Sequence, residues 1–467
     1  MNKGSDQVDL KTMDFTNHIG VFAIFLFFLV HVPLAYFAKT GGKNLLLAYS
    51  SVAIYGLWYP PGVLLVLFMA GIGFAFTRVR FSPKWQKTIL TLCISLCLAT
   101  LFVFKYFDFF TNLIGLEHHL DFVLPVGLSF YTFTVIGYLV DHHRREGPSL
   151  KTFSDNLLLV VFWPHLAAGP ILRSPSFATQ IITRIRFSWR DYYFATILVV
   201  NGAIKKVLIA DNLGAYVNQN LSEGISKMHT LDALVTILGF GGQIYADFSG
   251  YTDMAIGLAL FVGFKLPANF NYPYLSTTLT EFWRRWHISL STWFRDYVFI
   301  PLGGSRGSAL RTFRNLMIVF LLSGFWHGAG YNFVMWGAIH GLFVALEKIG
   351  YKHYIVVSSS IRWLVTMAIV TVAWTFFRLD IVDASELLRI IFQLRWNASA
   401  SSPYALLPIV FFLILIALDH IVRVVEVDRD NMLMLRSSRW KTFYLLGMFG
   451  VTLLFSGKPL PYIYFNF

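Results

Sequence analysis

The chain has 467 residues, of which 56% are hydrophobic and only 13% are charged. Ordinary soluble domains carry roughly 25% charged residues, so this composition excludes a soluble domain and predicts a polytopic membrane protein. The formal net charge of +13 would favour nucleic-acid binding in a soluble protein. In a membrane protein, basic cytoplasmic loops explain this charge better, so we expect membrane lipid, and no nucleic acid, as a partner.

Residues 1–12 are mostly polar and are predicted to form an N-terminal extension, followed by a single membrane domain at 13–467. Residues 153–172 and 260–274 are shorter apolar stretches broken by glycine and proline, and we predict that they are re-entrant. About eleven crossings of roughly 20 residues each are predicted. They start near His18, Asn44, Gly62, Thr88, Phe122, Tyr193, Leu231, Leu316, Trp363, Leu406 and Thr442.

The charges in the loops indicate which side of the membrane each loop occupies. Residues 78–87 contain four basic residues and no acid, which is typical of a cytoplasmic loop. Acidic residues dominate at 108–121 and basic residues at 144–151, so the sides alternate and the N-terminus is expected outside the cytoplasm. The first apolar run is too long for a cleavable signal peptide and lacks a small-residue cleavage site, so we expect the first helix to be retained.

Function is expected at about residues 124–345, which are dense in glycine, proline, arginine, histidine, aspartate and tryptophan. If residues 281–297 form one helix, Arg284, His287, Ser291 and Arg295 lie on a single stripe at positions i, i+3, i+7 and i+11. One face would then be cationic and able to exchange a proton. The alternative is an amphipathic anchor at the cytoplasmic interface, because the segment is also rich in tryptophan and phenylalanine.

A second histidine, His327, lies in an apolar stretch with glycines on both sides of it, at positions 324, 328 and 330. Glycine lets a ligand or another backbone approach closely. Ionisable residues within membrane spans are usually functional, so we favour a functional role for His327. His340 follows on a predicted helix, and for it we favour the alternative of a core residue that is hydrogen-bonded to backbone. The role of His165 stays open.

Asp247 and Asp253 are two acids in an apolar background. Buried carboxylates need partners, and we predict that the arginines of 281–297 provide them. A structural ion-pair role and a catalytic role are equally compatible with the pattern, and Asp296 is assigned to the same supporting group. The only cysteines, Cys93 and Cys97, are predicted to be packing residues, so we expect neither a disulfide nor a metal site.

Two stretches, 124–131 and 162–170, would break helices at membrane depth. Broken helices commonly line a cavity, and the alternative is a kink that serves packing alone.

Five segments together resemble the membrane-bound O-acyltransferase (MBOAT) family: 125–133 (PVGLSFYTF), 165–173 (HLAAGPILR), 247–257 (DFSGYTDMAIG), 281–304 (beginning EFWRRWH) and 326–328 (WHG). They are most similar to the bacterial branch that O-acetylates alginate, other exported polysaccharides or peptidoglycan. The resemblance implies an all-α, multi-pass fold around a central tunnel in the bacterial inner membrane. It departs at His142 and His143 after Asp141, and at Trp163 before Pro164, which leaves the acceptor open.

The resemblance also implies roles for particular residues. His327 corresponds to the catalytic histidine of the family and His287 to its second histidine, both near the constriction of a tunnel. It implies no bound cofactor, an acyl-CoA (acetyl-CoA) or acyl-carrier thioester as donor, and a partner similar to SGNH hydrolases outside the cytoplasm.

These roles agree with the chemistry of the side chains. A hydroxyl that attacks a thioester needs a base, which we predict to be His327, while His287 stabilises the developing oxyanion or orients the donor. Arg284 and Arg295 would bind donor phosphates, with Ser291 and Trp326 beside them. A proton-coupled transporter and a non-catalytic scaffold remain as alternative functions.

Overall fold

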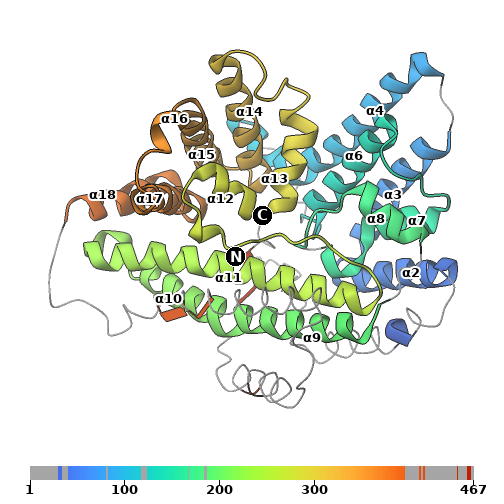
Figure 1. The fold of residues 1–467 in the computed structure, drawn as a ribbon, viewed down its shortest axis with the longest axis horizontal. Helices are drawn as coiled ribbons and strands as arrows, with labels where there is room; N and C mark the ends of the chain where they lie inside the picture. Colours follow the sequence, from blue (N-terminus) through green and yellow to red (C-terminus); the bar gives the residue numbers. More distant parts are fainter. Residues whose placement is uncertain are drawn as a thin grey trace, which may run out of the picture.

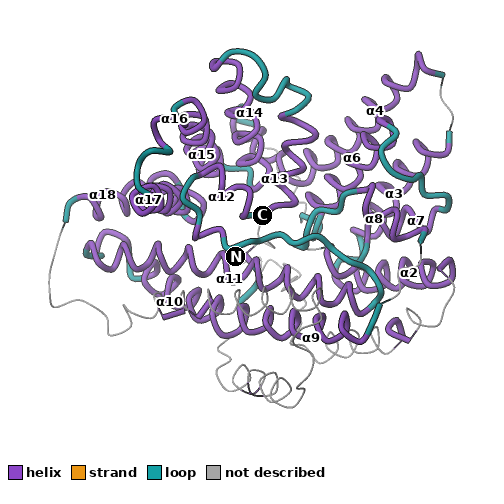
Figure 2. The backbone as a smooth tube through the Cα atoms, viewed as in Figure 1, coloured by secondary structure: helices purple, strands orange, loops and turns teal. Residues whose placement is uncertain are grey.

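The computed structural model describes residues 30–33, 40–79, 82–116, 124–166, 168–183, 187–394 and 460–463, with six further residues at 410, 411, 414, 415, 447 and 450. Over these ranges the chain is helical, with loops and no strands (Figure 2). The predicted all-α fold is therefore confirmed. The N-terminal extension at 1–12 lies outside the described residues, and so do most residues of the spans predicted to start near His18, Leu406 and Thr442.

The α-helices are α2 (Thr40–Trp58), α3 (Gly62–Arg78), α4 (Pro83–Leu101), α5 (Phe107–Leu113), α6 (Leu128–Arg144), α7 (Phe153–Val161), α8 (Ser174–Ile182), α9 (Trp189–Ile204), α10 (Asp211–Ser222), α11 (Thr230–Phe261), α12 (Leu279–Arg285), α13 (Ile288–Phe294), α14 (Ala309–His327), α15 (Tyr331–Ile349), α16 (Tyr351–Tyr354), α17 (Ser359–Arg378) and α18 (Ile381–Phe392). Short 3₁₀ turns are η2 (Trp163–His165), η4 (Ile225–Lys227) and η5 (Pro273–Leu275). Segments η1 (Phe102–Tyr106), η3 (Lys205–Ala210) and η6 (Arg295–Phe299) are π-helical.

Helix α11 is 32 residues long and crosses most of the width of the molecule (Figure 1). Helices α9 and α10 pack against it on one side. On its other side, α2, α3, α4, α6, α7 and α8 form one group and α14 to α18 another, with α12 and α13 between the two groups (Figure 1). Side-chain caps begin several of these helices, as where Thr278 accepts the amide of Glu281 at 3.0 Å at the start of α12.

Eight of the predicted spans correspond to described helices, namely α2, α3, α4, α6, α9, α11, α14 and α17. Three helical runs in the described ranges are long and apolar enough to cross a membrane: Lys84–Leu113, Trp189–Ser222 and Ser359–Arg378. Helix α3 is apolar but shorter. The total of about eleven crossings, the boundaries of the single domain and the side on which each loop lies all stay predictions.

The predicted helix breaks at 124–131 and 162–170 are present, and they pack against each other. Gly127 has a φ of +75°, and a Cβ on it would lie 2.2 Å from the carbonyl oxygen of Leu166. Tyr55 donates a 3.0 Å hydrogen bond to the carbonyl of Val126, and Phe162 is fully buried. The non-helical backbone is therefore covered by protein, as re-entrant segments require.

After α11 the chain runs back through an irregular loop to α12 (Figure 2). Much of this loop is buried, including Phe264, Leu266 and Asn269. The loop matters because it meets the segment that carries His287.

Candidate active site

Residues 281–297 do not form the continuous helix that the sequence predicts. Helix α12 ends at Arg285, Trp286 is extended, and His287 adopts the left-handed conformation with φ 43° and ψ 56° before α13 begins. The single stripe of Arg284, His287, Ser291 and Arg295 is therefore wrong. The interfacial-anchor alternative also fails, because the aromatic residues Phe282, Trp283, Trp286, Trp293 and Phe294 are buried inside the protein.

Asn269 holds the break in place. Its backbone carbonyl accepts the amide of Ile288 at 3.0 Å, and its side-chain oxygen accepts the amide and hydroxyl of Ser289 at 3.1 and 2.8 Å. A non-glycine residue in the left-handed region costs roughly 1–3 kcal/mol and persists only where the surroundings enforce it. The loop before α12 thus fixes the imidazole of His287, which packs edge-on against Phe248 of α11 with ring centroids 4.7 Å apart.

His327 is the last residue of α14, and glycines bring this helix close to α15. A Cβ on Gly324 would lie 2.2 Å from the carbonyl oxygen of Phe333, and one on Gly337 would lie 2.4 Å from that of Phe320. The sequence left open whether the glycines near His327 make room for a ligand or for another backbone. At Gly324 it is the backbone of Phe333 that approaches. Small residues at such positions let membrane helices pack tightly.

The two predicted catalytic histidines lie together. Their ring centroids are 6.5 Å apart, and His287 and His327 are 0% and 3% exposed. The ring of Trp326 lies 6.1 Å from His287 and 4.8 Å from His327. Trp336 of α15 lies 5.0 Å from His327. Both imidazoles therefore lie close together within one buried shell of aromatic side chains.

His340 is a buried, hydrogen-bonded core residue, as favoured from the sequence, although its partner is a side chain rather than backbone. Its Nδ1 accepts the indole N–H of Trp283 at 3.3 Å. Trp336 lies between it and His327, with centroids 5.0 Å from each. His165 is also buried, next to Phe162 and Phe177.

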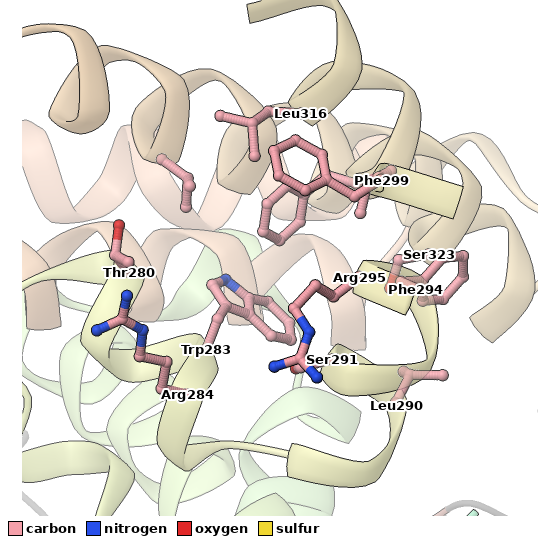
Figure 3. A pocket seen from close by; sticks show the side chains of 13 residues that line it. Thr280, Trp283, Arg284, Leu290, Ser291, Phe294, Arg295, Phe299, Leu316 and Ser323 are labelled. Carbon is pink, nitrogen blue, oxygen red and sulfur yellow. The ribbon is translucent and has the colours of Figure 1, made fainter. Parts of the chain in front are cut away.

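A pocket of about 160 Å³ lies beside this shell (Figure 3). Arg284, Ser291 and Arg295, which were predicted to bind the donor, all line it. In Figure 3 the indole of Trp283 lies between the two arginine side chains. The other lining residues are mostly apolar and come from α12 to α15 and η6: Thr280, Trp283, Leu290, Phe294, Phe299, Leu316, Val319, Phe320, Ser323 and Val344.

The pocket stops short of the histidines. It reaches Ser323, one helical turn before His327, but neither histidine nor Trp326 lines it. Trp283, in the pocket wall, contacts Trp336 at 5.6 Å, and Trp336 contacts His327. The helix breaks at 124–131 and 162–170 contribute no lining residue to this pocket either. A tunnel that passes the two histidines therefore stays a prediction.

Asp247, which is buried, and Asp253, which is half-buried, both form ion pairs, but the predicted arginine partners are wrong. Lys206 approaches Asp247 to 2.9 Å and Lys205 approaches Asp253 to 2.7 Å. Both lysines lie in the π-helical segment η3, which packs against α11. Lys206 also donates to the carbonyl of Leu460 at 2.7 Å. A supporting role is thus favoured over a catalytic one for both acids.

Asp296 forms the predicted supporting ion pairs at the edge of the pocket. Its carboxylate lies 2.6 Å from Arg173 and 2.7 Å from Arg295. Partial burial alone would raise the pKa of Asp296, but the hydrogen bond from Arg295 and the charge of Arg173 outweigh it and hold that pKa below its usual value. Arg295 is therefore already paired, whereas Arg284 forms no ion pair with any residue that the structure describes.

Three residues beside the histidines were not predicted from the sequence: Asn269, Trp336 and Lys105. Lys105 donates to the carbonyl oxygens of Trp326 and His327 at 2.5 and 3.2 Å. A lysine near the end of an otherwise apolar span could have been noticed, since charges at membrane depth are rare.

The fold and the site define a multi-pass membrane protein with a paired-histidine centre next to a basic pocket. Residues 138–382 match the MBOAT, membrane-bound O-acyltransferase family, and the match includes both histidines. The chain belongs to this family and is an O-acyltransferase. This excludes the transporter and scaffold alternatives.

Several relatives align with half of the chain or more. The probable alginate O-acetylase AlgI of Pseudomonas aeruginosa is 38% identical over 375 residues, which cover 76% of this chain and 71% of the relative. The peptidoglycan O-acetyltransferase of Helicobacter pylori is 37% identical over 311 residues, 59% of each chain. The teichoic acid D-alanyltransferase of Bacillus subtilis is 29% identical over 265 residues, 52% of this chain and 65% of the relative.

Proposed function

We propose that this enzyme acetylates hydroxyl groups of an exported polysaccharide of the alginate type, with His327 as the base. The observation that carries the proposal is the 6.5 Å separation of the two imidazoles beside a pocket with arginines at its wall. The relatives support the choice of an alginate-type acceptor, because the alginate O-acetylase aligns with more of the chain than the peptidoglycan enzyme does. Peptidoglycan is the second candidate acceptor.

In the proposed reaction a hydroxyl oxygen attacks the carbonyl carbon of an acetyl thioester. His327 accepts the hydroxyl proton as the C–O bond forms, and it returns the proton to the thiolate when the C–S bond breaks. The negative charge that develops on the carbonyl oxygen needs donors in a dry site. The indole N–H of Trp326 is buried without a hydrogen-bond partner among the described residues, so it is available for this purpose, and the ring of His287 lies 6.1 Å from the indole.

The donor is proposed to be acetyl-CoA or an acyl-carrier thioester that enters the pocket from the cytoplasm. Arg284 is the better candidate for its phosphates, because it is exposed at the pocket wall and forms no ion pair among the described residues. Arg295 is already paired to Asp296, so it contributes charge at longer range. The hydroxyl of Ser291 donates a 3.3 Å hydrogen bond to the carbonyl of Trp286, and the residue forms part of the pocket wall.

The proposed setting is the bacterial inner membrane, with the N-terminus outside the cytoplasm and a partner similar to SGNH hydrolases on that side. In this arrangement the hydroxyl that attacks the thioester belongs either to the polymer or to a serine of the partner. The distribution of basic residues among the loops supports the orientation.

Replacement of His327 by alanine tests the proposal. Loss of the base should reduce acetyl transfer to polymer by roughly 10²–10⁴-fold, with unchanged amounts of protein in the membrane. The matched control is His353→Ala, an exposed histidine on α16, which should retain full activity. Polymer acetate measured in cells that lack the chromosomal copy gives the answer, and undiminished acetylation by His327→Ala would refute the proposal.

A further inference from the structure

Lys105 belongs to η1, the π-helical segment that follows α4, and it reaches the end of the helix that carries His327. Its ammonium lies 2.5 Å from the carbonyl oxygen of Trp326 and 3.2 Å from that of His327. The next residue, Tyr106, donates its hydroxyl to the carbonyl of Phe325 at 2.9 Å. Two successive side chains of η1 thus satisfy three successive carbonyls of α14.

These contacts supply hydrogen-bond donors to the carbonyl groups at the C-terminal end of α14. The last four carbonyls of a helix have no partner within the helix, and the helix dipole places partial negative charge at that end. A lysine there forms hydrogen bonds to the carbonyls and interacts favourably with the dipole. Because His327 is the last residue of α14, the geometry of this final turn sets where its imidazole lies.

The surroundings of Lys105, which is half-buried, differ from those of the buried lysines Lys205 and Lys206. Lys205 and Lys206 each pair with carboxylates, whereas Lys105 forms no ion pair with any described residue. Its remaining hydrogen-bond partner is the hydroxyl of Ser129 on α6, at 3.4 Å. A cation at membrane depth is costly, and it is usually retained for function.

The π-helical turn explains how both side chains reach α14. A π-helix closes its hydrogen bonds from i to i+5, so it is wider than an α-helix, and such turns occur frequently at functional sites. Within η1, Lys105 and Tyr106 are directed to the same helix end, and Tyr106 also stacks on Phe325 with centroids 4.3 Å apart.

We propose that Lys105 is a positioning residue that holds the last turn of α14 so that the imidazole of His327 faces that of His287. The inference rests on the proposed role of His327 as the base. Lys105 touches the backbone of the catalytic helix and not the reacting atoms, so it should affect the rate of transfer and not the binding of the donor.

The test compares kcat and KM of the full-length enzyme in membranes, with acetyl-CoA as donor and alginate as acceptor. Lys105→Met should lower kcat by about 10–100-fold, the cost of a misplaced catalytic group, and leave KM for acetyl-CoA within about twofold. Lys105→Arg should recover part of the rate. The matched control is Lys43→Met, which removes a lysine that donates to the carbonyl of Gly263 instead, and it should not change kcat.

A double-variant cycle separates positioning from general stabilisation. If Lys105 acts through His327, then Lys105→Met should cause no further loss in the His327→Ala background. Equal fold-losses in both backgrounds, a raised KM, or an activity loss that only follows a loss of folded protein would overturn the inference. Lys105→Gln, which keeps a hydrogen-bond donor, serves the same test if Lys105→Met fails to accumulate.

The outcomes also separate this inference from the proposed function. If His327→Ala retains acetylation, the proposed base is wrong and the role of Lys105 falls with it. If His327→Ala is inactive while Lys105→Met has normal kcat, only the positioning role is overturned.

Discussion

Replacement of Gly337 by alanine should impair catalysis although this residue is one helix away from the reacting groups. Gly337 lies on α15 at its closest approach to α14, and an added Cβ would lie 2.4 Å from the carbonyl oxygen of Phe320. Ordinary contact begins at 3.4 Å, so the backbones must separate by about 3.4 − 2.4 = 1.0 Å at this point. The three atoms nearest to the added Cβ all belong to the backbone of α14, so no neighbouring side chain can move aside to relieve the clash.

This displacement sets the expected magnitude. Overpacking of this kind typically costs roughly 1–3 kcal/mol of stability. A shift of about 1 Å in a catalytic group can reduce the rate by as much as ~10²-fold. Because His327 ends α14 two turns after Phe320, we expect kcat to fall by about 10–100-fold while the enzyme still folds.

The assay is acetyl transfer per amount of folded enzyme, combined with thermal unfolding in detergent. Gly71→Ala is the matched control, because a Cβ on Gly71 in α3 would meet nothing within 4 Å. Alanine there should raise helix stability slightly and leave activity unchanged. Normal kcat in Gly337→Ala would refute the argument that the α14–α15 contact fixes His327.

Two further predictions concern charged groups. Asp247→Asn should lower stability by up to about 3–5 kcal/mol, because Lys206 loses a buried carboxylate and keeps only a 2.8 Å ion pair with Asp211. Thermal unfolding measures this, with Arg389→Gln on the exposed face of α18 as a control that should show no change. Since the folded-state pKa of Asp296 is below its usual value, the stabilisation from its ionised form is present above about pH 4 and is lost as pH falls through the folded pKa. Unfolding temperatures of wild type and Asp296→Asn should therefore differ at neutral pH and converge in acid, and a constant difference would contradict this reasoning.

The sequence predicted the all-α fold and the two histidines that the structure brings together, but not how they come together. Hydrophobic runs of roughly 20 residues are long, regular signals, so eight predicted spans match described helices. The break at Trp286 and His287 has no comparable signal, because residues 281–297 have acceptable helix formers throughout. What breaks the helix is Asn269, nearly twenty residues earlier, whose hydrogen bonds to Ile288 and Ser289 are tertiary.

The partners of Asp247 and Asp253 likewise depend on tertiary packing that the sequence does not show. The apolar sequence around Asp247 and Asp253 correctly predicted cationic partners for both acids, but arginines and lysines from several segments were equally suitable. Lys205 and Lys206 are the residues that pair with the two acids, because η3 packs against α11. This contact joins residues more than forty positions apart in the sequence.

The π-helical segments give these separate observations a common structural basis. In the described part of the chain they are η1, η3 and η6, and each carries the basic residue that contacts a key element: Lys105 on α14, Lys206 on α11, and Arg295 at the pocket wall. One extra residue in a helical turn changes the direction of every side chain that follows it, which an α-helical projection of the sequence cannot represent. The stripe predicted for Arg284 to Arg295 failed for a similar reason, since it assumed one uninterrupted period. In this enzyme the directions of these three basic side chains thus depend on local departures from the α-helix, which the apolar pattern of the sequence does not reveal.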